Sequence, residues 1–438
     1  MPHGFARIPD GGSYVLANAT VPAVLIDGAV GFPDGEGLVT ADITVENDRV
    51  TAVTAPGGPN GIPRLNLDGG MVWPTFVDLH THLDKGHIWR RSATPGGTFA
   101  DALAAVRKDR TERWKPDDLR DRIDFSVRSA FAHGTAMIRT HVDSDSPQHR
   151  ISWPVVAEMR ERWAGRIDLQ AVSIFEIEAF LDPAFADDIV AIVTEHGGIL
   201  GAFVYPTPDL DRAIELMMHR AANRNLDLDF HVDETSDPNA HGLRVIADAA
   251  LRTDFPGTIV AGHCCSLAMQ PDAEAEATMD RVAEADIAVV SLPMCNVHLQ
   301  DRSAEATPRW RGVTLVHELA ARGVRVSVAS DNTRDPFYDY GDLDMLEVFR
   351  EAVRILHLDH PMGKWPAAVA RTPAGVMGSE GRGVIAAGAP ADLVLFRARD
   401  YTELLSRPQS DRTVIRDGRP IDTTLPDYRE LDHLQERR

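Results

Sequence analysis

Residues 76–84 read FVDLHTHLD. A short apolar run that ends in polar residues is typical of a buried parallel strand. Seven more apolar runs follow it, each bounded by turn residues and separated by longer amphipathic segments. The eight expected strands are Phe76–Leu83, Ala136–Val142, Ile167–Phe175, Ile199–Tyr205, Leu226–Val232, Thr258–His263, Ile287–Pro293 and Val324–Ala329. Strands that alternate with helices predict a parallel sheet, and eight such units predict a closed (β/α)8 barrel.

The segments between these runs have the pattern of helices, whereas the two ends of the chain have the pattern of short strands. Apolar residues recur at helical spacing in 211–223, 272–284 and 314–322, which predicts three helices. The ends carry short β-rich pieces between Gly and Pro clusters, at Ala23–Asp27, Asp42–Val45, Val50–Val53, Ala391–Arg397 and Thr413–Gly418. We therefore predict a catalytic barrel over residues 74–376 and a small β-sandwich domain assembled from residues 1–73 and 377–438.

Composition limits the classes of partner. The chain has 438 residues and a formal net charge of −21, which opposes binding to nucleic acid or to an anionic membrane surface. The N-terminus has no basic region followed by an apolar stretch, and no apolar run approaches a membrane span. We expect a cytoplasmic enzyme that acts on a small molecule and forms a homo-oligomer.

The three cysteines, Cys264, Cys265 and Cys295, are too few and too unevenly placed for a disulfide framework. A thiolate metal site is disfavoured because the adjacent pair lacks C-x2-C spacing and has no second pair. We expect all three to be reduced.

Candidate metal ligands fall at the carboxyl ends of the predicted strands, where barrel enzymes place their active sites. His80 and His82 project to the same face of the first strand, so both imidazoles can reach one ion. The fifth, sixth and eighth strands end at His231, His263 and Asp331. Such a set would hold a divalent ion and leave a position open for water. The alternative is a set of unrelated histidines on the rim.

The motifs resemble the cytosine deaminase branch of the amidohydrolase superfamily, over nearly the whole chain. The resemblance is carried by residues 80–84 (HTHLD), 139–143 (RTHVD), 231–234 (HVDE), 296–300 (NVHLQ), 311–314 (RGVT), 331 with 335–336 (Asp, and Asp-Pro) and 388–396 (GAPADLVLF). The last of these is similar to the superfamily's return into its β domain.

The resemblance implies a metal-dependent hydrolytic deaminase of a cytosine, isoguanine, pterin or aminotriazine type of ring. Metal-bound hydroxide would attack the amino-bearing carbon and release ammonia. The implied ligands of one divalent ion, zinc or iron, are His80, His82, His231 and Asp331. Glu234 would carry protons, His263 would orient the water, and Asp331 would also accept a proton. This chemistry is consistent, because cleaving an amidine-like C–N bond needs an activated hydroxide and a proton donor.

Two departures from cytosine deaminase concern the substrate. Asn332 stands where that enzyme has a second acidic residue, and the run 330–335 looks like relatives that hydrolyse aminotriazines. Glu176 stands where a glutamine reads the pyrimidine. An ionised carboxylate only accepts hydrogen bonds, so it suits a ring edge with adjacent N–H donors. The alternative is a rim glutamate paired with an arginine.

Weaker candidates surround this set. Phe337 is the preferred residue for stacking on a flat ring, ahead of Trp89, Tyr338 and Tyr340. His298 and Gln300 would touch substrate or only fix the seventh loop. The segment 139–143 would either support the site from behind the ligands or simply close the second strand.

Two other functions compete with deamination. A cyclic-amide hydrolase of the dihydropyrimidinase type would carry a metal-bridging lysine at the end of the fourth strand, yet the lysines are Lys85, Lys108, Lys115 and Lys364. A non-catalytic barrel that binds a heterocycle would be expected to have lost the proton shuttle, whereas Glu234 is present. One metal and a catalytic role are favoured.

Overall fold

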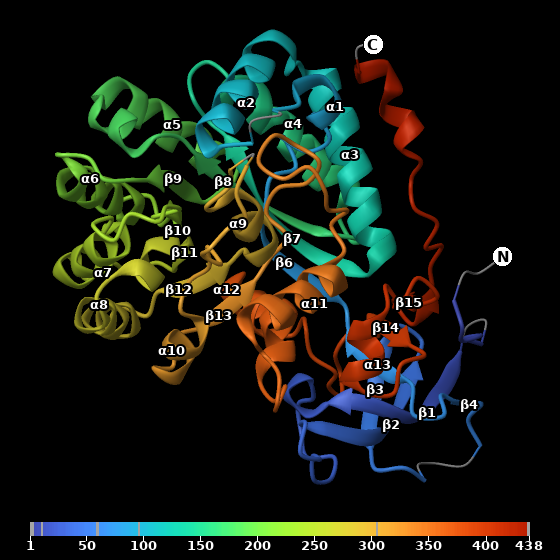
Figure 1. Ribbon diagram of the computed structural model, residues 1–438. Helices are drawn as coiled ribbons and strands as arrows, with labels where there is room; N and C mark the ends of the chain where they lie inside the picture. Colours follow the sequence, from blue (N-terminus) through green and yellow to red (C-terminus); the bar gives the residue numbers. More distant parts are fainter. Residues whose placement is uncertain (1–3, 10–11, 58–60, 95–96, 304, 436–438) are drawn as a thin grey trace. The chain divides into compact units, whose positions relative to one another are not determined.

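The computed structural model describes residues 4–9, 12–57, 61–94, 97–303 and 305–435 (Figure 1). Two compact units divide the chain: one holds residues 1–78, 128–137 and 344–426, and the other holds residues 79–127, 138–343 and 427–438. The domain boundaries predicted after residues 73 and 376 stay a prediction.

Eight strands form a barrel, and most of their residues belong to the second unit. They are β6 (Phe76–Thr81), β7 (Thr135–Asp143), β8 (Asp168–Ile174), β9 (Leu200–Val204), β10 (Leu228–Val232), β11 (Ile259–His263), β12 (Ala288–Ser291) and β13 (Val326–Val328). Strands β6 to β8 form one sheet and β9 to β13 another, in chain order. The bridges Val172–Ile199 and Thr81–Asp331 join the two sheets at both edges, so the ring closes. The predicted barrel and all eight predicted strands are confirmed.

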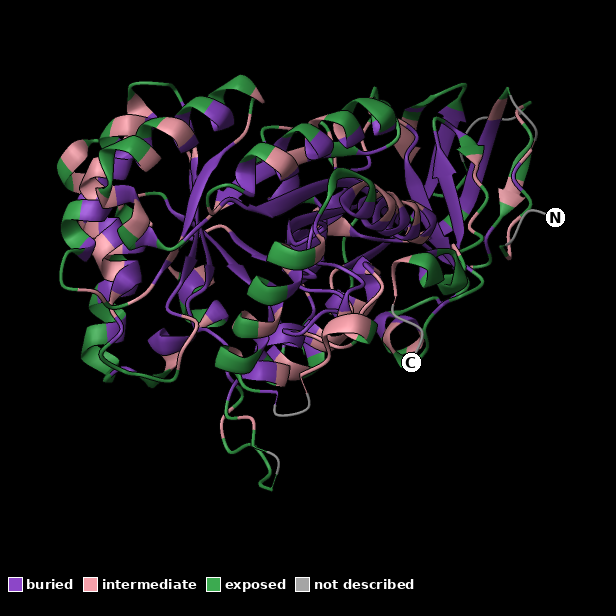
Figure 2. Cartoon of the chain, turned by 90° about the horizontal axis from the view of Figure 1, so that it is seen from above, coloured by how far each residue is buried: buried purple, intermediate pink, exposed green. Residues whose placement is uncertain are grey.

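Helices cover the outside of these strands. They include α3 (Pro116–His133), α4 (His149–Trp163), α5 (Pro183–Glu195), α6 (Leu210–Ala222), α7 (Gly242–Thr253), α8 (Asp272–Glu284) and α10 (Val316–Ala321). Two further helices, α2 (Phe99–Arg113) and α9 (Pro293–Leu299), lie at the rim where the strands end. The three predicted helices are confirmed as α6, α8 and α10. Figure 2 shows that the strands are buried while the outer faces of the helices are exposed. Among the described residues, no helix combines the length and the apolar character that a membrane crossing needs.

The first unit contains a mixed eight-stranded sheet to which both ends of the chain contribute. Its strands lie in the order β16 (Arg419–Pro420), β15 (Thr413–Arg416), β14 (Leu393–Phe396), β5 (Met71–Pro74), β1 (Ser13–Pro22), β2 (Leu38–Glu46) and β3 (Arg49–Thr54), and β4 (Arg64–Asn66) pairs with β1. Apolar side chains from both ends share one buried cluster, including Leu16, Ile43, Val72, Leu395 and Ile415. The prediction that the small β domain is built from both termini is confirmed.

One predicted strand is wrong. The run Ala23–Asp27 contains a short 3-10 helix, η1 (Ala23–Leu25), and the strand lies just before it, in β1. The N–H of Ile26 bonds to the carbonyl of Ala23, so the run turns after β1, and only a single bridge from Ile26 to Ile385 follows the turn. The spacing of apolar residues does not distinguish a short strand from a 3-10 turn in a run of this length.

Candidate metal centre and substrate pocket

Four predicted ligands converge at the carboxyl ends of three barrel strands. His80 lies in β6, His82 directly follows it, His231 lies in β10, and Asp331 follows β13. All four side chains are almost fully buried. Strand ends that are distant in sequence meet at one rim because the parallel strands point the same way.

The donor atoms are spaced as the ligands of a single ion would be. Nε2 of His231 lies 3.1 Å from Nε2 of His80 and 3.1 Å from Nε2 of His82. Oδ1 of Asp331 lies 3.6 Å and 3.3 Å from the same two nitrogens. Two ligands bound at about 2.1 Å with a tetrahedral angle lie roughly 3.4 Å apart. The residues therefore fit a divalent ion.

The ionisation of the histidines agrees with this fit. Burial, together with the neighbouring imidazoles, holds the pKa of His80, His82 and His231 well below the usual value, and Lys85 adds to the effect on His80 and His82. Neutral imidazoles are the form that binds metal. Nε2 of His263 is buried and has no hydrogen-bond partner among the described residues. This buried polar atom needs a partner such as an ion or water.

Glu234 and His263 stand beside the cluster, linked by an asparagine. Nδ2 of Asn296 donates to Oε1 of Glu234 at 3.1 Å and lies 3.0 Å from Nδ1 of His263. Burial, and then the nearby carboxylate of Asp331, raise the pKa of Glu234 well above its usual value. A carboxyl group with a raised pKa is suited to donating a proton.

Sharp backbone turns place these residues. Asp233, His263 and Asp331 have φ values of 49°, 67° and 60°, in the left-handed region that non-glycine residues seldom adopt. The carboxylate of Asp233 accepts the N–H groups of Gly242 and Leu243 at 3.0 Å, at the start of α7. Such conformations cluster at functional sites, where surrounding contacts compensate for the strain.

A pocket of about 680 Å³, including solvent at its mouth, opens above the cluster. Its walls contain His82, His231, Glu234, His263 and Asp331 together with apolar side chains of α2, of β9 and of nearby loops, namely Phe99, Leu103, Val106, Phe175, Phe203 and Phe337. Phe99 stacks on Phe203 with ring centroids 5.9 Å apart and meets Phe337 edge-on at 5.5 Å. The pocket suits a small flat ring.

The predicted substrate-binding residues divide into two groups. Glu176, Asn332 and Phe337 line the pocket, whereas among the described residues His298 does not contribute to its walls. His298 instead lies 3.6 Å from Asp339 and packs edge-on against the rings of Tyr338 and Tyr340. Trp89 lines a separate hollow with His87 and Tyr428. Gln300 donates to the backbone carbonyl of Glu234 at 3.2 Å.

Glu176 is paired with an arginine. Its carboxylate accepts a hydrogen bond from Arg107 of α2, and the two side chains are 48% and 45% exposed. The metal-cluster side chains are at most 4% exposed by residue. Glu176 and Arg107 therefore lie at the mouth of the pocket, while the cluster lies at its floor.

The segment 139–143 lies directly against the metal cluster. His141 packs on His80 with ring centroids 3.9 Å apart, and its Nε2 lies 3.2 Å from Asp229. Arg139 donates to the other oxygen of Asp229 at 2.9 Å and to Gln170. Barrel interiors are usually filled by aliphatic side chains, so this buried polar layer is specific to the site.

Among the pocket residues that the sequence pattern does not indicate, two polar ones lie beside the metal cluster. Asn296 links Glu234 to His263, and its motif (296–300) was recognised without a role for its first residue. Lys85 also lines the pocket, and its Nζ lies 2.8 Å from Oδ1 of Asp143. The chain has only four lysines, and Lys85 follows the candidate ligand His82 by three residues, so its place in the sequence could have indicated that it lies in the pocket.

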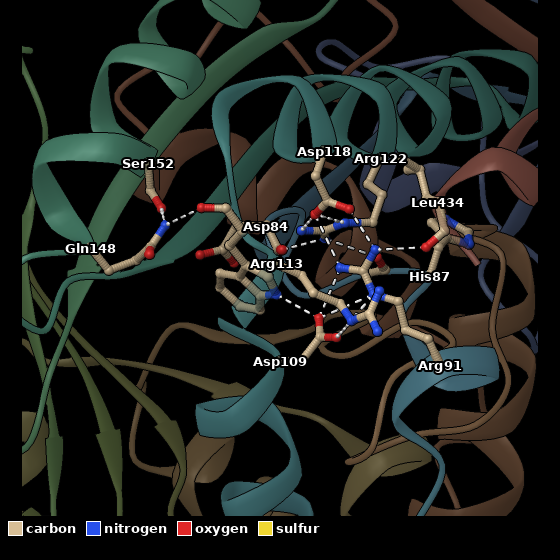
Figure 3. Close-up of polar contacts among 12 residues, drawn as sticks. Asp84, His87, Arg91, Asp109, Arg113, Asp118, Arg122, Gln148, Ser152 and Leu434 are labelled. Atoms are coloured by element: carbon tan, nitrogen blue, oxygen red, sulfur yellow. Dashed lines mark hydrogen bonds and ion pairs between the residues drawn. The ribbon is translucent and has the colours of Figure 1, made fainter. Parts of the chain in front are cut away.

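A buried ion network holds the loop that carries Lys85 (Figure 3). Arg122, fully buried, donates to the backbone carbonyls of Asp84 and Gly86 and pairs with Asp118 at 2.8 Å. Arg91 bridges Asp118 to Asp109 of α2. These contacts connect α2 and the loop after β6 through one network of ion pairs. The two pocket walls that α2 and this loop form are therefore held in place by the same network.

The cysteines are free and buried. Cys265 begins a short helix after β11, and Cys295 lies in α9, where its Sγ is 3.7 Å from Oδ1 of Asn332. Burial raises the pKa of all three thiols, which keeps them protonated.

Residues 162–422 match the model of the amidohydrolase family. The chain belongs to that family. A pterin deaminase of Rhizobium rhizogenes strain K84 is 54% identical to this amidohydrolase over 433 residues, which cover 99% of each chain. The structure of 5-methylcytosine deaminase from Klebsiella pneumoniae matches with a TM-score of 0.80, at 23% identity over 93% of this chain and 97% of that one. N-isopropylammelide isopropylaminohydrolase from Burkholderia multivorans matches with a TM-score of 0.74, at 24% identity over 95% of this chain and 100% of that one.

Proposed function

We propose that this amidohydrolase deaminates a 2-amino-4-oxo ring of the pterin type, converting the ring C–NH2 group and water to a ring carbonyl and ammonia. The observation that carries the proposal is the convergence of His80, His82, His231 and Asp331 at the floor of a pocket that Glu234 and His263 share. The ring type is supported by the 54% identity to a pterin deaminase over both whole chains.

One divalent ion, zinc or iron, would be held by His80, His82, His231 and Asp331. Bound there, the ion supplies Lewis-acid activation of water. His80, His82 and His231 contribute neutral nitrogens, and Asp331 contributes the one negative charge. A mononuclear centre is favoured because the residues after β9 are Tyr205 and Pro206, and no lysine stands there to bridge a second ion.

The remaining residues move protons and orient groups. Asp331 accepts a proton from the attacking water, and His263 orients that water. Glu234, fixed by Asn296, delivers its proton to the ring nitrogen next to the attacked carbon and regains one from the hydroxyl group that this carbon has gained. Asp331 passes the proton that it took from water to the departing ammonia. The apolar walls around Phe99 and Phe337 hold the ring and exclude other water from the reaction.

A coupled ammonia assay tests the proposal. We expect release of one ammonia per ring from pterin, with the dioxo product identified by mass, and much weaker activity on cytosine. Absence of ammonia from every 2-amino-4-oxo ring, with metal-replete protein, would contradict the proposed function. A cytoplasmic location and a homo-oligomeric state remain predictions from the sequence.

A further inference from the structure

Lys85 places a cationic hydrogen-bond donor in the wall of the pocket, beside the metal cluster. Its side chain is 8% exposed, and it lines the same pocket as His82, Glu234 and Phe337. Its Nζ lies 5.7 Å from the centre of the Phe337 ring. An ammonium group buried in a binding pocket costs free energy unless its N–H groups find acceptors.

Acceptors of the protein bind only some of the N–H groups of the Lys85 ammonium. Lys85 has three N–H groups, and one is directed to Oδ1 of Asp143 at 2.8 Å. Among the described residues, the other polar contact found for Nζ is Nδ1 of His82, at 3.4 Å. At least one N–H group therefore remains for a molecule in the pocket.

The position of the ammonium is fixed from several sides. Oδ2 of Asp143 accepts from Arg110 at 2.9 Å, and the backbone N–H of Asp143 donates to Asp84 at 2.8 Å. The carbonyl of Asp84 is in turn held by Arg122. The carboxylate of Asp143 pairs with this ammonium group at 2.8 Å, which compensates for its burial. A rigid donor of this kind selects substrates by geometry.

An ammonium group donates and never accepts, so the ring substituent that faces it must be an acceptor. In a 2-amino-4-oxo ring, the oxygen sits two ring atoms from the amino-bearing carbon. With that carbon at the metal cluster, the oxygen reaches the adjoining wall, where Lys85 follows His82 by three residues. An amino group at the same position would place two donors against each other.

We infer that Lys85 is a substrate-orienting residue that donates a hydrogen bond to the exocyclic oxygen of the ring. The inference rests on the proposed function. It names Lys85 as the residue that distinguishes an oxo group from other substituents at the ring carbon that bears the oxygen. In this arrangement the wall that carries Lys85 recognises the ring oxygen, while the metal cluster at the floor of the pocket faces the amino group.

The test compares pterin with its 4-thioxo analogue, because sulfur keeps the shape of the ring but is a weak acceptor. We expect the native enzyme to prefer the oxo ring by roughly 10- to 100-fold in kcat/KM, the usual worth of a charged hydrogen bond. In Lys85→Met this ratio should fall to about one, chiefly through loss of activity on the oxo ring. Lys108→Met, on the exposed face of α2, is the matched control and should keep the native ratio.

Metal content and thermal stability of each variant show whether it is folded. Asp143 keeps Arg110 as a partner in Lys85→Met, and the double variant Lys85→Met with Asp143→Asn removes both charges of the pair if the single variant is unstable. An unchanged oxo-to-thioxo ratio in a folded, metal-replete variant overturns the role of Lys85 alone. Failure of the native enzyme to release ammonia from any oxo ring overturns the proposed function, and this inference with it.

Discussion

Nε2 of His80 lies 3.1 Å from Nε2 of His231, although 151 residues separate them in the chain. Nε2 of His82 lies at the same distance from Nε2 of His231, and Oδ1 of Asp331 lies 3.6 Å and 3.3 Å from Nε2 of His80 and of His82. These four donor atoms surround one position at the separations that the ligands of a single ion have.

The first prediction concerns metal content. Purified native protein should hold about one divalent ion per chain, and His231→Ala should lose it together with activity. His219→Ala, at an exposed position in the last turn of α6, should behave as the native protein does. Elemental analysis after gel filtration measures both. Two tightly held ions that are both needed for turnover would refute a mononuclear centre.

The second prediction concerns Glu234. Glu234→Gln keeps the shape of the side chain and its contact with Asn296 but cannot transfer a proton. Turnover should fall by roughly two to four orders of magnitude while the metal remains bound. Glu195→Gln, at the exposed end of α5, is the control. Near-native kcat in Glu234→Gln, or loss of its metal, would remove Glu234 from the role of proton carrier.

The third prediction concerns the pair at the pocket mouth. If Glu176 reads donors on the ring, the Arg107 guanidinium competes with the substrate for the same carboxylate. Glu176→Gln should then raise KM by roughly 10-fold or more, because a charged hydrogen bond is lost, whereas Arg107→Gln should lower KM. Steady-state kinetics on pterin and on cytosine decide between the two roles. Equal effects of both variants, with an unchanged order of substrates, would leave Glu176 as a simple partner of Arg107.

The fourth prediction concerns stability in the first unit. The carboxylate of Asp344 caps α11 (Met345–Leu356) and receives two hydrogen bonds from Arg412, at 2.7 Å and 2.6 Å. Burial opposes its ionisation, but Arg412 holds the pKa of Asp344 well below the usual value. Asp344→Asn should cost about 3–5 kcal/mol of unfolding free energy at pH 7, because a buried arginine loses its partner charge.

The pH dependence of that cost follows from the direction of the shift. The folded pKa of Asp344 lies below the unfolded value of about 3.9, so the contribution is complete above that pH. It is lost as the pH falls through the folded pKa, and the difference between native and variant protein should narrow below about pH 4. Urea unfolding at several pH values measures this. Glu403→Gln, which removes a carboxylate from an exposed pair with Arg399, should change stability little. A gap that stays constant down to acidic pH would contradict the assignment.

Much of the fold was predictable from local pattern. Each barrel strand is a short apolar run between turn residues, and each is buried in the structure because parallel strands are covered on both faces. The predicted strand Ala23–Asp27 failed because an apolar run of five residues can also close a 3-10 turn. A local hydrogen bond from Ile26 to Ala23 decides that case, and apolar spacing does not encode it.

The identities of His80, His82, His231 and Asp331 as candidate ligands were readable from the sequence, because the residue type and its place at a strand end are both local properties. Their convergence to donor separations near 3 Å depends on closure of the barrel, which joins β6 to the end of β13. The pairing of Glu176 with Arg107 and the link from Glu234 through Asn296 to His263 likewise depend on contacts between elements far apart in the chain. Sequence alone determined which chemical groups the rim carries, because periodicity and residue type are written locally. Only the tertiary structure decided which of those groups share a partner, because burial and distance arise when the strands close into a ring.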